Sequence, residues 1–108
     1  MAWKFKCIAA AGMAALQFGS AALAQDSLGA GKRLFSQTAT PACSVCHTLK
    51  HAGAAGEIGP DLDELKPDAT RVKKAIRNGI GQMPAFTSLS DEQVKVLSQY
   101  VAEVTGAK

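Results

Sequence analysis

The chain has 108 residues, a length typical of one domain. Lysine and arginine outnumber aspartate and glutamate by 12 to 9, which gives a formal net charge of +3 at pH 7. This small excess, with no cluster of basic residues interleaved with aromatic ones, argues against a nucleic-acid-binding protein.

Residues 1–24 have the pattern of an export signal. Lys4 and Lys6 give a positive start, the following run is small, apolar and uncharged, and Ala22-Leu23-Ala24 is a small-x-small cleavage signature. The alternative is a retained membrane anchor, because the uncharged run approaches the ~20 residues that cross a bilayer. Its many alanines and the cleavage signature favour removal. We therefore expect a signal peptide over residues 1–24 and one exported domain over residues 25–108.

Removal of this leader would leave 84 residues, two cysteines and a net charge of +1. The only tryptophan would also be lost, so that Phe35, Phe86 and Tyr100 would be the remaining aromatic residues. A domain this small buries little apolar surface and tends to need a disulfide, a metal or a cofactor.

The first half of the domain contains two predicted helical segments and no clear strand pattern. The first covers about residues 27–36, and the second is a short turn around residues 43–49. In the first segment four residues recur at helical spacing: Leu28, Gly31, Leu34 and Phe35.

The second half contains two longer predicted helices. One covers residues 68–78, because Pro67 and Asp68 suit a helix start and Gly79 suits a stop. The other begins at Ser90, which forms a capping-box pattern with Gln93. Its apolar face repeats at three and four: Val94, Leu97, Tyr100, Val101 and Val104.

An all-α fold is therefore predicted, with two glycine- and proline-rich loops over residues 51–61 and 79–88. Loops of this length in so small a domain are usually functional. We expect them to wrap around a bound group.

The most informative stretch is Cys43-Ser44-Val45-Cys46-His47. A redox disulfide of the thioredoxin type would need a βαβ pattern, which is missing. A structural zinc site needs four ligands, and His51 is the only spare histidine. Covalent haem attachment explains the spacing, because on one helical turn both thiols reach the two vinyl groups of a porphyrin edge and His47 faces the iron. We therefore predict one haem c, bound through Cys43 and Cys46.

The sixth ligand of such an iron is predicted to be Met83, the only methionine outside the leader. A thioether is a soft ligand for haem iron, and Met/His ligation raises the reduction potential. The alternative, that Met83 fills a gap in the core, fits poorly with a glycine-rich loop. His51 follows His47 closely on the same side of the haem, so we interpret it as a solvated loop residue.

These residues give the domain a resemblance to small bacterial class I cytochromes c. In that family a glycine of the first helix is followed four residues later by an aromatic residue, and Gly31 and Phe35 match. An aromatic residue of the last helix packs on the glycine, and Tyr100 matches. The segment Asn78–Phe86 resembles the loop that carries the methionine ligand.

The resemblance implies an all-α cytochrome c fold, with three to four helices wrapped around one covalently bound haem. Gly59-Pro60-Asp61-Leu62 resembles the segment whose proline carbonyl accepts the second N–H of the haem-binding histidine. It implies His47 and Met83 as iron ligands. The full set of cofactor-binding residues is then Cys43, Cys46, His47, Pro60 and Met83.

The resemblance also implies a periplasmic one-electron carrier rather than an enzyme. Its relatives act between dehydrogenases, for example molybdenum sulfite dehydrogenases, and terminal oxidases. Two alternatives stay open: a haem peroxidase or small-ligand sensor with a displaceable Met83, and a fixed haem subunit of a dehydrogenase complex.

Partners are expected to be redox proteins that dock briefly on a monomer, through a small apolar patch ringed by charges. No membrane span is expected if the leader is cleaved. Candidates for the charged ring are Lys50, Lys73, Lys74 and Arg77.

Overall fold

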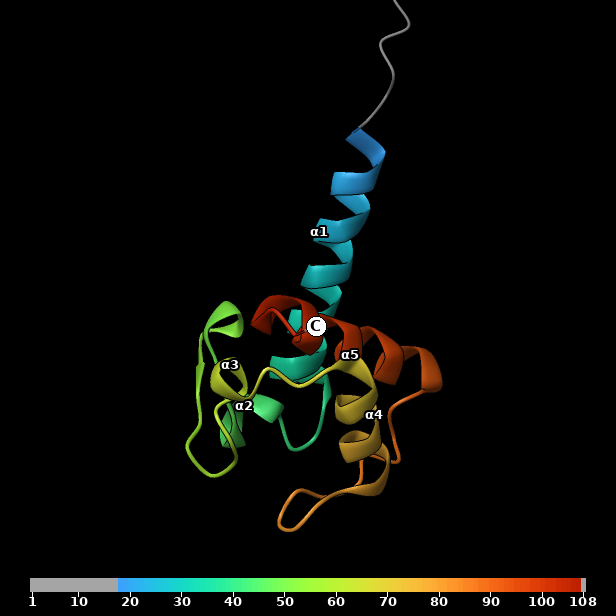
Figure 1. Ribbon diagram of the computed structural model, residues 1–108. Helices are drawn as coiled ribbons and strands as arrows, with labels where there is room; N and C mark the ends of the chain where they lie inside the picture. The colour runs from blue at the N-terminus through green and yellow to red at the C-terminus, as the bar shows by residue number, and fades with distance from the viewer. Residues whose placement is uncertain (1–17, 108) are drawn as a thin grey trace, which may run out of the picture.

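Helices account for most of the regular structure in residues 18–107, the part of the chain that the computed structural model describes. Residues 1–17 of the expected leader lie outside this part. Figure 1 shows α5 crossing the lower end of α1, with α4 beside α5 and the α2 and α3 segment on the other side. The elements in chain order are α1 (Phe18–Arg33), η1 (Leu34–Thr38), α2 (Cys43–Cys46), β1 (Thr48–Leu49), η2 (Lys50–Ala52), β2 (Ala54–Ala55), α3 (Leu62–Leu65), α4 (Ala69–Asn78) and α5 (Asp91–Thr105). The predicted all-α class is confirmed.

The first helix starts earlier than predicted. α1 begins at Phe18 instead of near Ser27, and the expected cleavage point after Ala24 lies within it. The segment before Ser27 is rich in alanine and has no proline, so its helix propensity is high although it lacks an amphipathic pattern. α1 continues into the wider π-helical turn η1, which buries Leu34 and Phe35.

The crossing of α1 and α5 depends on Gly31, as predicted. A Cβ atom built at Gly31 would overlap the Cβ and Cγ atoms of Tyr100. The two helices therefore approach closely only because Gly31 has no side chain. Phe35 lies edge-on to Tyr100 with ring centroids 6.4 Å apart, and both rings are fully buried.

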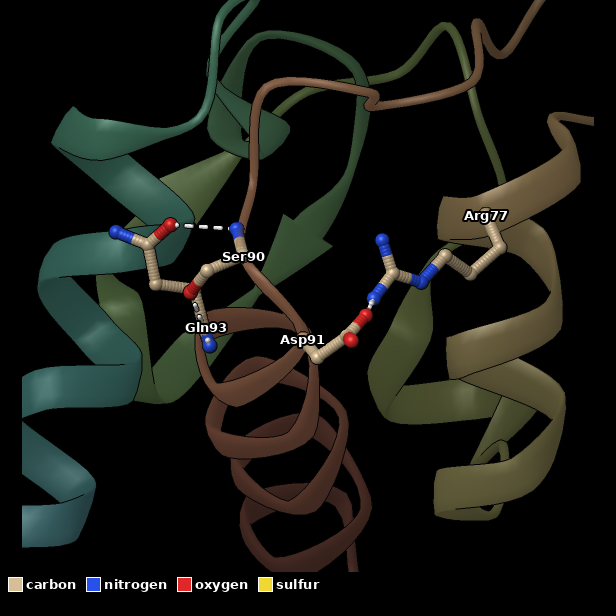
Figure 2. A network of polar contacts seen from close by, with 4 residues as sticks. All are labelled: Arg77, Ser90, Asp91 and Gln93. Atoms are coloured by element: carbon tan, nitrogen blue, oxygen red, sulfur yellow. Dashed lines mark hydrogen bonds and ion pairs between the residues drawn. The ribbon is translucent and has the colours of Figure 1, made fainter.

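The last helix has the predicted apolar face and the predicted cap. Val94, Leu97, Tyr100 and Val101 are buried, and Val104 packs against them. At the start of α5, the Gln93 N–H donates to Ser90 Oγ (3.1 Å) and the Ser90 N–H donates to Gln93 Oε1 (2.9 Å), as Figure 2 shows. This reciprocal pair is the predicted capping box.

The helix predicted over residues 68–78 is α4. Asp68 caps it by accepting a hydrogen bond from the Arg71 N–H (2.8 Å), and it ends at Gly79 with a positive φ of 69°. Arg77 forms an ion pair with Asp91, which joins the end of α4 to the start of α5 (Figure 2). The Asp91 carboxylate is exposed, so this pair contributes at most about 1 kcal/mol.

Two short features were not predicted: α3, and the hairpin of β1 and β2 with the connecting turn η2. α3 is a single turn, capped by Asp61, which accepts from the Asp63 N–H (2.9 Å). β1 and β2 form a two-residue antiparallel hairpin, with Thr48 opposite Ala55. Neither is long enough to show a helical or strand period, so sequence spacing gives no signal for them.

Substitution of Gly31 with alanine is expected to destabilise the protein. The added methyl group overlaps Tyr100, and overpacking of this kind costs about 1–3 kcal/mol. Gly29→Ala is the matched control on the same helix, because its Cβ would meet only Arg33 Nη1 at an ordinary 3.6 Å. That change should stabilise by up to ~1 kcal/mol through helix propensity. Denaturant unfolding measures both, and equal effects would contradict the close crossing.

Candidate functional site

A cavity of about 730 Å³ opens between the helices, and its wall is mostly apolar. Cofactor sites commonly have volumes of ~300–1,000 Å³ and apolar walls with a few polar groups. Phe35 of η1, Leu97 and Val101 of α5, and Ile76 of α4 provide part of the apolar wall. The five residues singled out in the sequence all line this one cavity: Cys43, Cys46, His47, Pro60 and Met83.

The two cysteines lie on α2, one helical turn apart. Both are free thiols that line the cavity, and the turn places positions three apart on one face. Burial raises the pKa of the Cys43 thiol to about 11, with a smaller contribution from Cys46. Among residues 18–107, no group of three or more histidine, cysteine or acidic side chains is placed to bind a metal ion.

The histidine after the second cysteine is held by the following loop. Its Nδ1 lies 2.7 Å from the Pro60 carbonyl oxygen, and because a carbonyl only accepts, Nδ1–H is the donor. In the neutral ring with its proton on Nδ1, Nε2 is the nitrogen that can bind a metal. Gly59 lies against the ring, since a Cβ there would come within 2.6 Å of His47 Cε1.

The loop is also fixed to the backbone of the CxxCH turn. The Gly59 N–H donates to the Cys46 carbonyl (2.6 Å), and the Gly56 N–H donates to the His47 carbonyl (3.3 Å). A Cβ at Gly56 would come within 2.6 Å of the Cys46 carbonyl carbon. The glycines of the predicted loop over residues 51–61 thus allow the loop to pack directly on this turn.

Met83 lies in a tight turn after α4. The Ile80 N–H donates to the Met83 carbonyl (3.0 Å), and the Met83 N–H donates to the Ile80 carbonyl (2.9 Å). Gly81 within the turn has a positive φ of 55°, which favours glycine. The Met83 side chain is partly buried and packs against the core. The turn therefore places a thioether in the cavity wall without help from a regular element.

His51 is exposed, as predicted, and does not line the cavity. The prediction missed its partner, because Nδ1 lies 2.7 Å from the Tyr100 hydroxyl. This hydrogen bond joins η2 to α5. Burial, and to a smaller extent the Asp63 charge, raise the pKa of Tyr100 to about 12.

Substitution of Tyr100 with phenylalanine is expected to cost about 1 kcal/mol at neutral pH, through loss of the hydrogen bond to His51. The raised pKa of Tyr100 means that the unfolded chain ionises first as the pH rises from about 10 to about 12. The wild type therefore loses stability over this range. The variant has no Tyr100 hydroxyl to ionise, so its stability does not fall for this reason. Denaturant unfolding of both proteins should show their difference shrinking above pH 10, and a constant difference would contradict this expectation.

The four residues expected in a ring of docking charges stand differently toward the cavity. Lys74 lines it, Lys50 and Lys73 do not, and Arg77 is paired with Asp91. The docking role of all four stays a prediction. Arg71, which was not predicted, also lines the cavity. The helical spacing from Arg71 to Lys74 is the signal in the sequence that would have indicated it.

This chain is closely similar to a solved structure. That structure is the c-type cytochrome SorU from Sinorhizobium meliloti, with 49% identity and a TM-score of 0.73, and the match covers 77% of this chain and 95% of that one. No curated protein matches the chain.

An all-α fold around an apolar cavity, with a CxxCH turn in its wall and this similarity, defines a small class I cytochrome c. Such a protein transfers electrons and is not an enzyme. A family model described as "Cytochrome C oxidase, cbb3-type, subunit III" matches residues 26–101, and the chain belongs to this family. The predicted cytochrome c fold is thus confirmed. None of the helices between residues 18 and 107 combines the length and the apolar composition needed to cross a bilayer.

Proposed function

We propose that the chain is a periplasmic one-electron carrier that holds a single covalent haem c. When bound, the haem supplies an iron that alternates between the ferric and ferrous states. The observation that carries the proposal is that Cys43, Cys46, His47, Pro60 and Met83, from separate stretches of the sequence, line one cavity. The volume and apolar wall of that cavity suit a porphyrin.

Cys43 and Cys46 are proposed to attach the cofactor. Each thiol would add across a vinyl group, so that a C–S bond forms and the thiol hydrogen passes to the neighbouring carbon. Both cysteines are reduced and lie on one turn. The turn is anchored by the His47 N–H, which donates to the Cys43 carbonyl (2.9 Å), so the two sulfur atoms keep a fixed spacing.

His47 and Met83 are proposed as the residues that would hold the haem iron. The bond from His47 Nδ1–H to the Pro60 carbonyl fixes the orientation of the ring, so that Nε2 is the nitrogen that would bind the iron. The Met83 turn provides the thioether. An iron bound by both residues would have no position left for a substrate, which suits electron transfer. Peroxidase or sensor chemistry would need Met83 to leave the iron.

The partner surface is proposed to be the opening of the cavity. Ile58 and Ile80 line the cavity and are still 66% and 72% exposed. Exposed apolar residues that gather at one opening are typical of contact sites, whereas single ones are not, and Lys74 lines the same cavity and adds a charge. We propose transient docking of a monomer with a periplasmic dehydrogenase, for example a molybdenum sulfite dehydrogenase, as donor, and with a terminal oxidase as acceptor.

The experiment that tests the main proposal is an intact mass and an absorption spectrum of the exported protein. We expect residues 25–108 plus one haem, with the leader 1–24 removed. The ferric protein should be low-spin, with a near-infrared sulfur-to-iron charge-transfer band. A colourless protein of polypeptide mass would refute the proposal.

A second candidate is a fixed haem subunit of a larger complex, because the description of the matching family names an oxidase subunit. Size-exclusion chromatography of the native extract separates the two candidates. A free carrier elutes at the mass of one small domain at all salt concentrations, whereas a fixed subunit co-elutes with a larger partner.

A further inference from the structure

The charged residues of the cavity wall are few and have one sign. Among the described residues, Arg71 and Lys74 are the only lining side chains with a formal charge at neutral pH, and no acidic residue lines the cavity. A haem brings two propionate carboxylates, and a buried or half-buried carboxylate without a partner is costly. The only tryptophan of the chain is Trp3, in the expected leader, so no indole N–H of the domain can serve as that partner.

The two cations belong to a polar stripe on α4. Arg71, Lys74 and Asn78 follow one another at spacings of three and four and all line the cavity, so they share one side of the helix. The neighbouring stripe on α4, with Val72 and Ile76, is apolar and also lines the cavity. α4 thus offers an apolar surface to a porphyrin plane and hydrogen-bond donors along one border of it.

The position of α4 agrees with the chemistry of the porphyrin. The two vinyl groups lie on adjacent pyrrole rings, and the two propionates lie on the other two rings. If α2 fixes the vinyl edge, the carboxylates lie at the opposite edge. α2 packs against η1 and β2, whereas α4 packs against α5, and Figure 1 shows α2 and α4 on different sides of the domain.

Arg71 is better placed for this contact than Lys74. Arg71 lines the haem cavity and also a second, open cavity of about 420 Å³ beside Pro67 and Gly106. Its side chain therefore lies at a border where a carboxylate meets both protein and water. A guanidinium group matches the two oxygens of a carboxylate in a bidentate pair, which an ammonium group does not.

The Arg71 side chain is available to bind a ligand. Within residues 18–107 its guanidinium makes no ion pair, in contrast to Arg77, which pairs with Asp91. The nearest acid in sequence, Asp68, accepts the Arg71 backbone N–H instead, through its Oδ1. We propose that Arg71 binds a haem propionate and holds it ionised, an assignment that rests on the proposed haem site.

The test is the midpoint potential of Arg71→Gln, Arg71→Lys and Lys73→Gln as a function of pH. The other titratable side chains on the cavity wall are Cys43, Cys46, His47 and Lys74. In the wild type we expect a potential that does not change with pH near neutrality, because the propionate stays ionised. In Arg71→Gln the pKa of the propionate should rise. The midpoint potential should then fall as the pH rises through neutrality, since ionisation of the propionate makes reduction of the iron less favourable.

The controls separate this role from a general charge effect. Arg71→Lys keeps the charge and should largely restore the flat profile. Lys73→Gln removes the same charge from the same helix at a position outside the cavity wall, and should keep the wild-type profile. A flat profile in Arg71→Gln, with haem bound and the sulfur-to-iron band present, overturns the assignment alone. A wild-type protein without haem overturns the assignment and the proposed function together.

Discussion

Replacement of Cys46 with alanine is expected to leave the haem loosely held or lost and the polypeptide largely unfolded. The domain is built around a cavity of about 730 Å³. Without the haem, the apolar wall of that cavity would face water, and apolar surface left unburied costs roughly 25 cal/mol per Å². A whole domain has only ~5–15 kcal/mol of stability to offset this loss. We therefore expect the chain without haem to be largely unfolded, because the ligand stabilises only the native state.

Circular dichroism and an absorption spectrum of the exported Cys46→Ala variant measure this effect. We expect most of the helical signal to disappear together with the haem absorption. Ser44→Ala is the matched control, because Ser44 lies on the same turn but does not line the cavity, and it should keep both signals. A haem-free Cys46→Ala protein with native helix content would show that the fold does not need the cofactor.

The parts of the fold that the sequence predicted are those in which one local pattern decides the structure. The cap of α5 needs only Ser90 and Gln93, two residues that meet in any helix start. The contact of Gly31 with Tyr100 was predicted from a resemblance, and the structure gives its physical reason in the overlap that any Cβ would cause. The residues expected to bind the haem belong to motifs that are each local, and the structure places them in the wall of one cavity. Their role as haem ligands stays a prediction.

Of the features that were missed, the hydrogen bond of His51 and the ion pair of Arg77 depend on contacts between distant segments, whereas the early start of α1 does not. The His51–Tyr100 hydrogen bond spans 49 positions, and nothing near His51 indicates that partner. Arg77 was expected in a docking ring, but its pairing with Asp91 depends on how α4 meets α5. The early start of α1 reflects helix propensity without an amphipathic pattern, a signal that a search for apolar periodicity does not detect.

The contacts around His47 bear on the proposed electron transfer. The CxxCH turn, the loop over residues 51–61 and α5 are joined by hydrogen bonds and close glycine contacts rather than by long regular elements. If His47 binds the iron as proposed, these contacts would help to hold its ring in place when the charge of the iron changes. Small structural change between the two oxidation states is what a carrier of single electrons requires.

Replacement of Met83 with alanine is expected to lower the reduction potential and to open the iron to external ligands. The thioether stabilises the ferrous state, and axial ligands tune haem potentials over about 0.8 V. We therefore expect a fall on the order of 0.1–0.3 V, within that range. The variant should lose the near-infrared sulfur-to-iron band and bind carbon monoxide or cyanide, and redox titration with ligand-binding spectra measures each effect.

The control for Met83 is its neighbour Gln82, which lines the same cavity but has no soft donor atom. Gln82→Ala should keep the band and a potential near that of the wild type, so a loss caused only by a disturbed loop would appear in both variants. If Met83→Ala kept the wild-type potential, the thioether would not be a ligand. The open site would then favour peroxide or small-ligand chemistry over electron transfer, because a sixth position without a protein ligand admits a substrate.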